Sequence, residues 1–201
     1  MSIVPKSVSV AIRNHFSELT DPRRREVIYP LINVVTIAVC AVVCGADDFV
    51  AIAAWGRTKK KWLATFLDLS RGIPSHDRFN AIFAAIKPAE FEKCLLSWIT
   101  ALHEISDGQI VAIDGKTLRR FAEAVRSHWG IENQLHWQLD VTFQEDQSRL
   151  REGHSATNFS LLRRAGLSLL KNNHTQKLGV KNKRLIAACD DSYLLQVLFN
   201  S

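Results

Sequence analysis

Apolar and polar residues alternate over much of the chain with the period of amphipathic helices. The first such stretch covers residues 31–44, where Pro30 suits a first helical turn and Gly45 suits a stop. Its Val and Ile residues would also serve a strand, but the length of the stretch favours a helix. A membrane span needs about 20 apolar residues, whereas this stretch is shorter and contains Asn33 and Thr36. The pattern therefore predicts a buried core helix.

The same spacing predicts further helices. Apolar positions on either side of Gly56 predict two short ones, and Ser75 is expected to cap the next. Residues 89–106 carry apolar side chains at intervals of three and four, which is typical of a longer amphipathic helix. We therefore predict an all-α N-terminal module over residues 1–106.

A second domain is predicted over residues 107–201. Its first feature is a turn signal followed by a short run rich in β-branched residues at 109–113, the best strand candidate in the chain. The run ends on Asp114, and α/β folds commonly place chemistry at the carboxyl end of a buried strand. The alternative is a turn aspartate that only caps the following segment.

One face of the helix predicted over residues 122–139 carries titratable side chains at intervals of four, namely His128, Glu132, His136 and Asp140. Residues four apart are neighbours on a helix. This face is therefore either a metal or proton-handling site, or an exposed stripe whose side chains only form ion pairs and hydrogen bonds with one another. The imidazoles in such a site would favour Zn²⁺ or a similar ion over hard cations.

The remaining sequence predicts an acidic-basic turn at 144–153 and two more helices, over 156–170 and 190–199. In the first of these helices Phe159 belongs to the apolar face, and the pair Arg163 and Arg164 is placed on the outside. Between the helices the pattern indicates a loop with five basic residues, Lys171, Lys177, Lys181, Lys183 and Arg184.

The charge balance favours a polyanionic partner. The chain has 26 Lys and Arg against 20 Asp and Glu, which gives a formal net charge of +6 and a sequence pI near 9.3. Nucleic acid is the commonest partner of such a chain, and the alternative is that the charges only solvate helices. The four cysteines show no CxxC pair, and the N-terminus lacks an apolar leader, so we expect reduced thiols in a cytoplasmic protein.

Three long segments form the most specific pattern in the sequence. They are DPRRREVIYPL at 21–31, VAIDGKTLRR at 111–120 and VRSHWGIENQLHWQLDVTFQEDQSRLREG at 125–153. Together they resemble the H-repeat-associated transposases of bacterial insertion sequences, a branch of the DDE transposases. The resemblance implies DNA transposition, in which metal-dependent phosphoryl transfer cuts and joins DNA strands at the element ends.

The resemblance also implies a ribonuclease H-like catalytic domain in which two aspartates and a glutamate hold divalent metal ions. By position, Asp114 matches the first aspartate and Glu132 matches the glutamate. Carboxylate oxygens suit Mg²⁺ or Mn²⁺, and two such ions stabilise both the attacking and the leaving oxygen of the reaction. The two residues are therefore the predicted catalytic and metal-binding residues.

The chain departs from the family between these two carboxylates. Only 17 residues separate Asp114 from Glu132, whereas the fold that the resemblance implies needs several strands and a helix between these two carboxylates. A strand needs about five residues and a helix about eleven, so the central sheet does not fit. We place the missing segment near residues 120–121. Asp140 is a poor substitute for the lost ligand, because it lies about 12 Å beyond Glu132 along the helix, while the ions of two-metal sites are about 4 Å apart.

The sequence thus predicts a mostly α fold with a remnant of an α/β ribonuclease H-like domain. We expect the protein to be defective in catalysis and to retain binding to double-stranded DNA. A homo-oligomer or a full-length transposase is the expected protein partner, and no membrane association is expected. The alternatives are an active transposase completed by another copy, a non-catalytic regulator of a full-length transposase, and a relic without function. The predicted DNA-binding residues are Arg23, Arg24, Arg25, Lys59, Lys60, Lys61, Lys116, Arg119 and Arg120.

Overall fold

The computed structural model describes residues 12–24, 27–106, 139–144, 146 and 149–199. The helices with both ends described are α2 (Leu31–Val43), α3 (Phe49–Thr58), α4 (Lys60–Leu63), α5 (His76–Ala85), α6 (Pro88–Ser106), α9 (Ser155–Asn172), α10 (Val180–Cys189) and α11 (Asp191–Phe199). No strand occurs among the described residues, which confirms the mostly α fold class at this level. The strand predicted at 109–113 lies outside them. The described part of the predicted remnant over residues 107–201 contains helices and no strand, so the α/β remnant stays a prediction.

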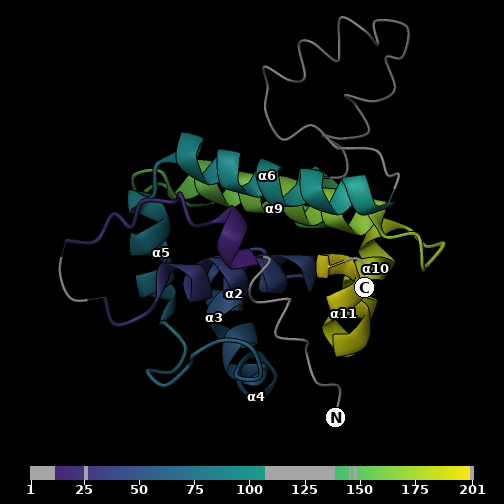
Figure 1. The fold of residues 1–201 in the computed structure, drawn as a ribbon, viewed down its shortest axis with the longest axis horizontal. Helices are drawn as coiled ribbons and strands as arrows, with labels where there is room; N and C mark the ends of the chain where they lie inside the picture. The colour runs from purple at the N-terminus through teal and green to yellow at the C-terminus, as the bar shows by residue number, and fades with distance from the viewer. Residues whose placement is uncertain (1–11, 25–26, 107–138, 145, 147–148, 200–201) are drawn as a thin grey trace, which may run out of the picture.

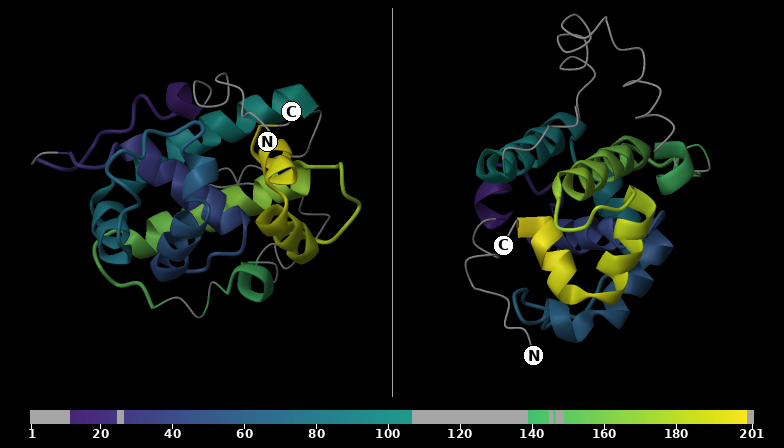
Figure 2. Two further views of the ribbon diagram at one scale, coloured as in Figure 1. Left: turned by 90° about the horizontal axis from the view of Figure 1, so that it is seen from below. Right: turned by 90° about the vertical axis from the view of Figure 1, so that its right-hand side faces the viewer.

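The helices are arranged in layers (Figures 1 and 2). The long helices α6 and α9 lie side by side, and α9 packs on α2 beneath them. Helix α5 contacts α9 at one end of the molecule, and α10 and α11 contact it at the other. A single hydrophobic core takes buried side chains from all eight helices, so the segments before and after residues 107–138 fold together. The domain boundary at residue 107 stays a prediction.

Helix α2 is the centre of this core, and its existence confirms the helix predicted over residues 31–44. Every side chain from Asn33 to Val43 is buried, which explains why the stretch is apolar on all sides rather than amphipathic. The buried Asn33 amide donates from Nδ2 to the Asp68 carbonyl at 2.6 Å. Within the described part of the chain, none of the helices has the length and apolar character that crossing a bilayer requires.

The predicted break at Gly56 is wrong, because α3 continues through this residue to Thr58. A Cβ at position 56 would lie 3.0 Å from the Ile73 side chain and 3.2 Å from that of Ile37. The glycine therefore serves close packing inside a helix. The break falls at Lys59, the residue between α3 and the short helix α4.

The next two helices follow the sequence prediction closely. Ser75 caps α5, because its side chain accepts a hydrogen bond from the Arg78 backbone N–H at 3.3 Å. Helix α6 begins at Pro88, a residue that suits the first helical turn. Its side chains at Phe91 and Trp98 are buried in the shared core, as the spacing of three and four predicts.

The placement of Arg163 on the outside of α9 is wrong, because its side chain is only 2% exposed. It follows Phe159 by four residues, so both lie on the face of α9 that is packed in the core. The guanidinium carbon is 4.5 Å from the centre of the Phe159 ring, and Nη2 donates to the Asp47 carbonyl at 3.1 Å. A buried arginine is stabilised here by hydrogen bonding and by the ring face.

The basic loop predicted after α9 is mostly wrong, because Lys171 belongs to α9 and Lys181, Lys183 and Arg184 belong to helix α10. Lys183 is buried, and its Nζ donates to the carbonyls of Leu170 at 2.9 Å and Asn173 at 2.6 Å. A cation at these carbonyls complements the C-terminal end of α9. The last predicted helix is confirmed as α11.

All four cysteines lie in the described part and are free thiols. Cys40 and Cys94 are buried, whereas Cys189 is exposed. Burial raises the pKa of the Cys44 thiol to about 12 and raises the pKa of Cys40 strongly. Because the thiolate is the nucleophile, only Cys189 is poised for alkylation.

We therefore expect iodoacetamide at pH 8 to modify Cys189 at least about tenfold faster than Cys40 in the folded protein. Peptide mass spectrometry over a time course measures the four rates, and the same experiment in urea serves as the control, where the four thiols should react alike. Equal labelling of Cys40 and Cys189 without urea would contradict the packing of α2.

Candidate nucleic-acid interface

Six of the eleven predicted site residues lie outside the described part of the chain, namely Arg25, Asp114, Lys116, Arg119, Arg120 and Glu132. The metal-binding pair Asp114 and Glu132 therefore stays a prediction, as does the stripe that begins at His128. Among the described residues, no three His, Cys, Asp or Glu side chains are grouped as a metal site would require. Five of the predicted DNA-binding residues lie in the described part of the chain, namely Arg23, Arg24, Lys59, Lys60 and Lys61.

Arg23 makes internal contacts that hold a loop. Its Nε donates to Asp21 Oδ1 at 2.8 Å and its Nη2 to Oδ2 at 2.6 Å, while Nη1 donates to the Tyr29 carbonyl at 2.7 Å. The hydrogen bond from Arg23 lowers the pKa of the Asp21 carboxyl. Since the guanidinium donates to both of these partners and the side chain is only 18% exposed, this arginine links Asp21 to Tyr29 and is not directed to solvent.

Lys59 joins two distant helices. It lies at the junction of α3 and α4, and its Nζ is 2.7 Å from Oδ1 of Asp191, the first residue of α11. The lysine side chain is half-buried, so its ammonium is already neutralised by a carboxylate. We assign Lys59 to the packing of α11 against α4 rather than to an outward surface.

Lys60 and Lys61 remain outward-facing on the single turn of α4. That turn is anchored by the buried Leu63 and by Trp62, whose ring centre is 4.9 Å from that of Phe66 in an edge-to-face arrangement. Such aromatic pairs favour one geometry. The pair therefore fixes the backbone of the turn from which the two lysine side chains extend. The exposed Arg57 on α3 precedes them; we call Arg57, Lys60 and Lys61 the α4 cations.

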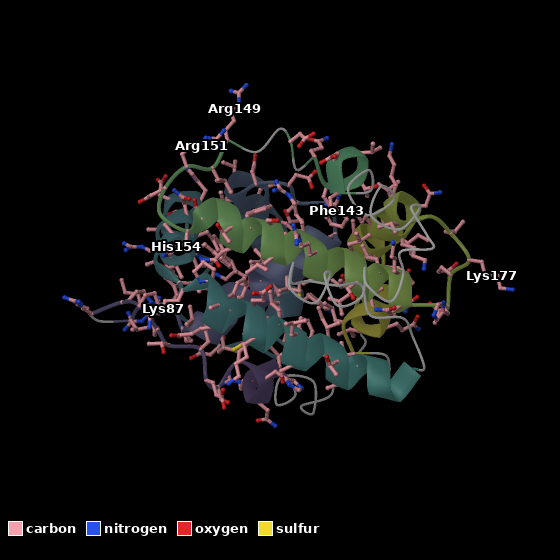
Figure 3. The ribbon with its side chains drawn as sticks, turned by 90° about the horizontal axis from the view of Figure 1, so that it is seen from above. Lys87, Phe143, Arg149, Arg151, His154 and Lys177 are labelled. Atoms are coloured by element: carbon pink, nitrogen blue, oxygen red, sulfur yellow. The ribbon has the colours of Figure 1, made fainter. Side chains whose placement is uncertain are left out.

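A second group of cations was overlooked in the sequence, where the segment was interpreted only as an acidic-basic turn. Arg149, Arg151 and His154 are exposed at the end of the molecule where α5 lies, with both arginines pointing outward (Figure 3). We call the two arginines the α5-end cations. The signal available in the sequence was the occurrence of two arginines close together in Arg149-Leu150-Arg151.

The α5-end cations are held by contacts with α5. The His154 backbone N–H donates to the Ala84 carbonyl at 2.9 Å, and Glu152 accepts a hydrogen bond from the Asn80 side chain at 2.5 Å. The buried Asn158 Nδ2 also donates to the Ile86 carbonyl at 2.9 Å. Lys87 lies nearby, but its ammonium pairs with Glu90 at 2.8 Å. The segment therefore presents its cations from a fixed backbone.

A family model described as DDE_Tnp_1-associated matches residues 13–99. The chain is 44% identical over 110 residues to an "Uncharacterized protein in dhlA 3'region" of Xanthobacter autotrophicus. It is 42% identical over 85 residues to the "H repeat-associated putative transposase YhhI" of Escherichia coli K12. It is 31% identical over 67 residues to the "Inactive transposase YbfQ" of the same strain.

These matches cover different shares of the two chains. The alignment takes in 52% of this chain and 37% of the Xanthobacter protein, and 42% of this chain and 22% of YhhI. With YbfQ it takes in 33% of this chain and 80% of the relative. The chain therefore spans less than half the length of the first two relatives and most of the third. No solved structure matches this chain.

Proposed function

This chain belongs to the H repeat-associated transposase family, and we propose that it binds DNA without catalysing transposition. The observation that supports this best is the shared core. Helices α2 to α6 and helices α9 to α11 bury one continuous set of apolar side chains, although the 17 residues between Asp114 and Glu132 are too few for a catalytic sheet. A folded body that carries exposed cations suits binding, and it disfavours a relic without function.

The loss of catalysis is inferred from the sequence spacing. The donor chemistry of Asp114 and Glu132 fits Mg²⁺ or Mn²⁺, which the family implies. However, two carboxylates are one short of the family's three ligands, and the 17 residues between them are too few for the several strands and the helix that the family's fold needs there. We therefore derive no catalytic step for this chain acting alone.

The proposed role is occupation of element ends or of a complex with a full-length transposase. The phosphate backbone supplies most of the affinity of such proteins, because Lys and Arg release counterions when they bind it. Arg24, the α4 cations and the α5-end cations are exposed and suited to this. The name of the relative YbfQ, "Inactive transposase", is consistent with a non-catalytic member of the family. A chain that binds ends but cannot cut them would compete with intact transposase.

The test is fluorescence anisotropy of the purified chain with a duplex from its own element's ends and with a scrambled duplex, each over a salt series. Tighter binding to the ends, weakening steeply with salt, is the expected result. Mg²⁺-dependent nicking by the chain alone, abolished by Asp114→Asn or Glu132→Gln, would overturn the loss of catalysis. Failure to bind either duplex at low salt would overturn the DNA-binding role itself.

The α4 lysines provide a sharper prediction. The double substitution of Lys60→Gln with Lys61→Gln is expected to weaken DNA binding about tenfold and to lower the salt slope by about 2. The matched control is the double substitution of Lys87→Gln with Lys93→Gln, because both lysines are exposed but already paired with Glu90 and Glu18. Anisotropy measures both. An equal loss in the two double variants would show that net charge, not the α4 surface, sets the affinity.

A further inference from the structure

Helix α5 is anchored on one side and exposed on the other. Its side chains at Phe79 and Phe83 are buried in the shared core. On the opposite side Arg78, Ala81 and Ala85 are exposed, and their spacing of three and four places them on one stripe of the helix. The helix lies at one end of the molecule, where it contacts α9 (Figure 1). An anchored helix therefore offers an accessible face to a partner.

The exposed face of α5 has the dimensions and side chains that suit a DNA groove. The major groove is about 12 Å wide and admits a helix, and the ten residues of α5 span about 15 Å. Alanine carries a single methyl group, so Ala81 and Ala85 let the bases approach closely, and such methyl groups contact thymine. Arg78 lies in the first turn of α5, the part of a groove-binding helix that contacts base edges.

The α5-end cations flank this face. The Asn80 side chain donates to Glu152 at 2.5 Å, and the Ala84 carbonyl accepts the His154 backbone N–H at 2.9 Å. Asn80 and Ala84 are neighbours on α5 and adjoin the stripe that contains Ala81, so residues 152–154 run beside the exposed face. The two arginines belong to the same segment and point outward (Figure 3). Cations beside a helix in a groove suit the phosphates at the groove edge.

Two carboxylates also lie at this end, and neither opposes DNA binding. Glu152 accepts the hydrogen bond from Asn80. The Asp77 side chain is 86% exposed, and its Oδ1 is 3.2 Å from His76 Nε2. A carboxylate accepts hydrogen bonds from the amino group of cytosine in the major groove. Together with Arg78 and the α5-end cations, this mixture of charges suits contacts with base edges as well as with phosphates.

We propose that α5 enters the major groove of the bound DNA, with Arg78 on a guanine edge and the α5-end cations on the flanking phosphates. The inference rests on the proposed DNA binding and adds the helix that distinguishes one sequence from another. Arginine donates to guanine O6 and N7 together, which other base pairs do not match. Phosphate contacts position the protein and carry no sequence information.

The first experiment separates base contacts from phosphate contacts in the anisotropy assay. Arg78→Ala should weaken binding to the element ends about tenfold and leave binding to the scrambled duplex nearly unchanged. The double substitution of Arg149→Gln with Arg151→Gln should weaken both complexes alike and lower the salt slope by about 2. Lys177→Ala is the control, because Lys177 is exposed at the opposite end of the molecule (Figure 3). It should leave both affinities nearly unchanged.

A modified DNA identifies the guanine contact directly. Replacement of guanine by 7-deazaguanine in the element ends removes the N7 acceptor from the major groove. It should weaken binding of the parent protein several-fold and should not weaken binding of Arg78→Ala any further, because that variant no longer uses the acceptor.

A blocking variant ties the preference for the ends to the face of α5. Ala81→Trp places a large ring on the exposed stripe, where it does not disturb the core, and it should abolish the preference for the element ends. Leu185→Trp is the matched control, since Leu185 is 60% exposed on α10. Urea unfolding of both variants checks that they are folded.

The outcomes separate this inference from the proposed function. Equal losses on the two duplexes in Arg78→Ala, or an unchanged preference for the ends in Ala81→Trp, would overturn the groove contact and leave DNA binding intact. Weakened self-association of Ala81→Trp in sedimentation, with the preference for the ends unchanged, would assign the face to a second copy of the chain and equally overturn the inference. Absence of binding to every DNA would overturn both proposals.

Discussion

Substitution of Arg184 by alanine is expected to lower the free energy of unfolding by about 3 kcal/mol. The Arg184 side chain is buried at the meeting point of α2, α10 and residues 139–143. Its Nη2 donates to the Val42 carbonyl at 3.0 Å and to Asp47 Oδ1 at 2.8 Å, and its Nη1 donates to the Thr142 carbonyl. The substitution leaves all three acceptors without this donor.

The expected loss has two physical sources. Removing one member of a buried ion pair costs about 3–5 kcal/mol, but the Asp47 side chain is 29% exposed, so water recovers part of the loss. The guanidinium carbon is also 4.1 Å from the centre of the Phe143 ring, and alanine forfeits that contact. The value of about 3 kcal/mol therefore lies at the low end of the buried-pair range.

Urea unfolding followed by tryptophan fluorescence measures this change, and Lys181→Ala on the same helix is the control. Lys181 is exposed, so its substitution should stay within about 0.5 kcal/mol of the parent. A loss below about 1 kcal/mol in Arg184→Ala would mean that the polar contacts joining α10 to α2 contribute little and that apolar burial alone holds the two segments together.

The helices that the sequence predicted are those whose apolar spacing is regular. Helices α2, α5, α6, α9 and α11 follow from intervals of three and four and from caps such as Ser75. Helix α10 was missed because its basic residues concealed the spacing of Val180, Arg184 and Ala187. Arginine can occupy the core face of a helix when it recurs at these intervals. On that rule both Arg163 and Arg184 are predicted to be buried.

The surface cations were harder to predict than the helices. Arg23 and Lys59 carry the same sequence signal as Arg24 and Lys60, yet the first two are held in ion pairs. Lys59 pairs with Asp191, 132 positions away, and only the tertiary fold brings them together. A run of basic residues in the sequence therefore indicates where phosphate contacts can form. Which of these residues point to solvent depends on whether an acidic residue from another helix forms an ion pair with them.

Gly153→Ala is the second substitution with a large expected effect, a loss of about 2–3 kcal/mol in the free energy of unfolding. Gly153 has φ of +46°, a backbone conformation that costs an L-residue about 1–2 kcal/mol. An added Cβ would also lie 2.6 Å from the Ala84 carbonyl oxygen. That oxygen accepts the His154 N–H, so it cannot withdraw without breaking the hydrogen bond that docks the α5-end cations.

Gly179→Ala separates these causes from a general effect of removing glycine. Gly179 has φ of −64° and no atom within 4 Å of an added Cβ, so its substitution should change stability by less than about 1 kcal/mol. Urea unfolding of both variants gives the comparison. If Gly153→Ala matched Gly179→Ala, residues 149–154 would not be fixed on α5. The α5-end cations would then bind DNA from a flexible segment. Ordering that segment would cost conformational entropy and would reduce the contribution of these cations to the binding free energy.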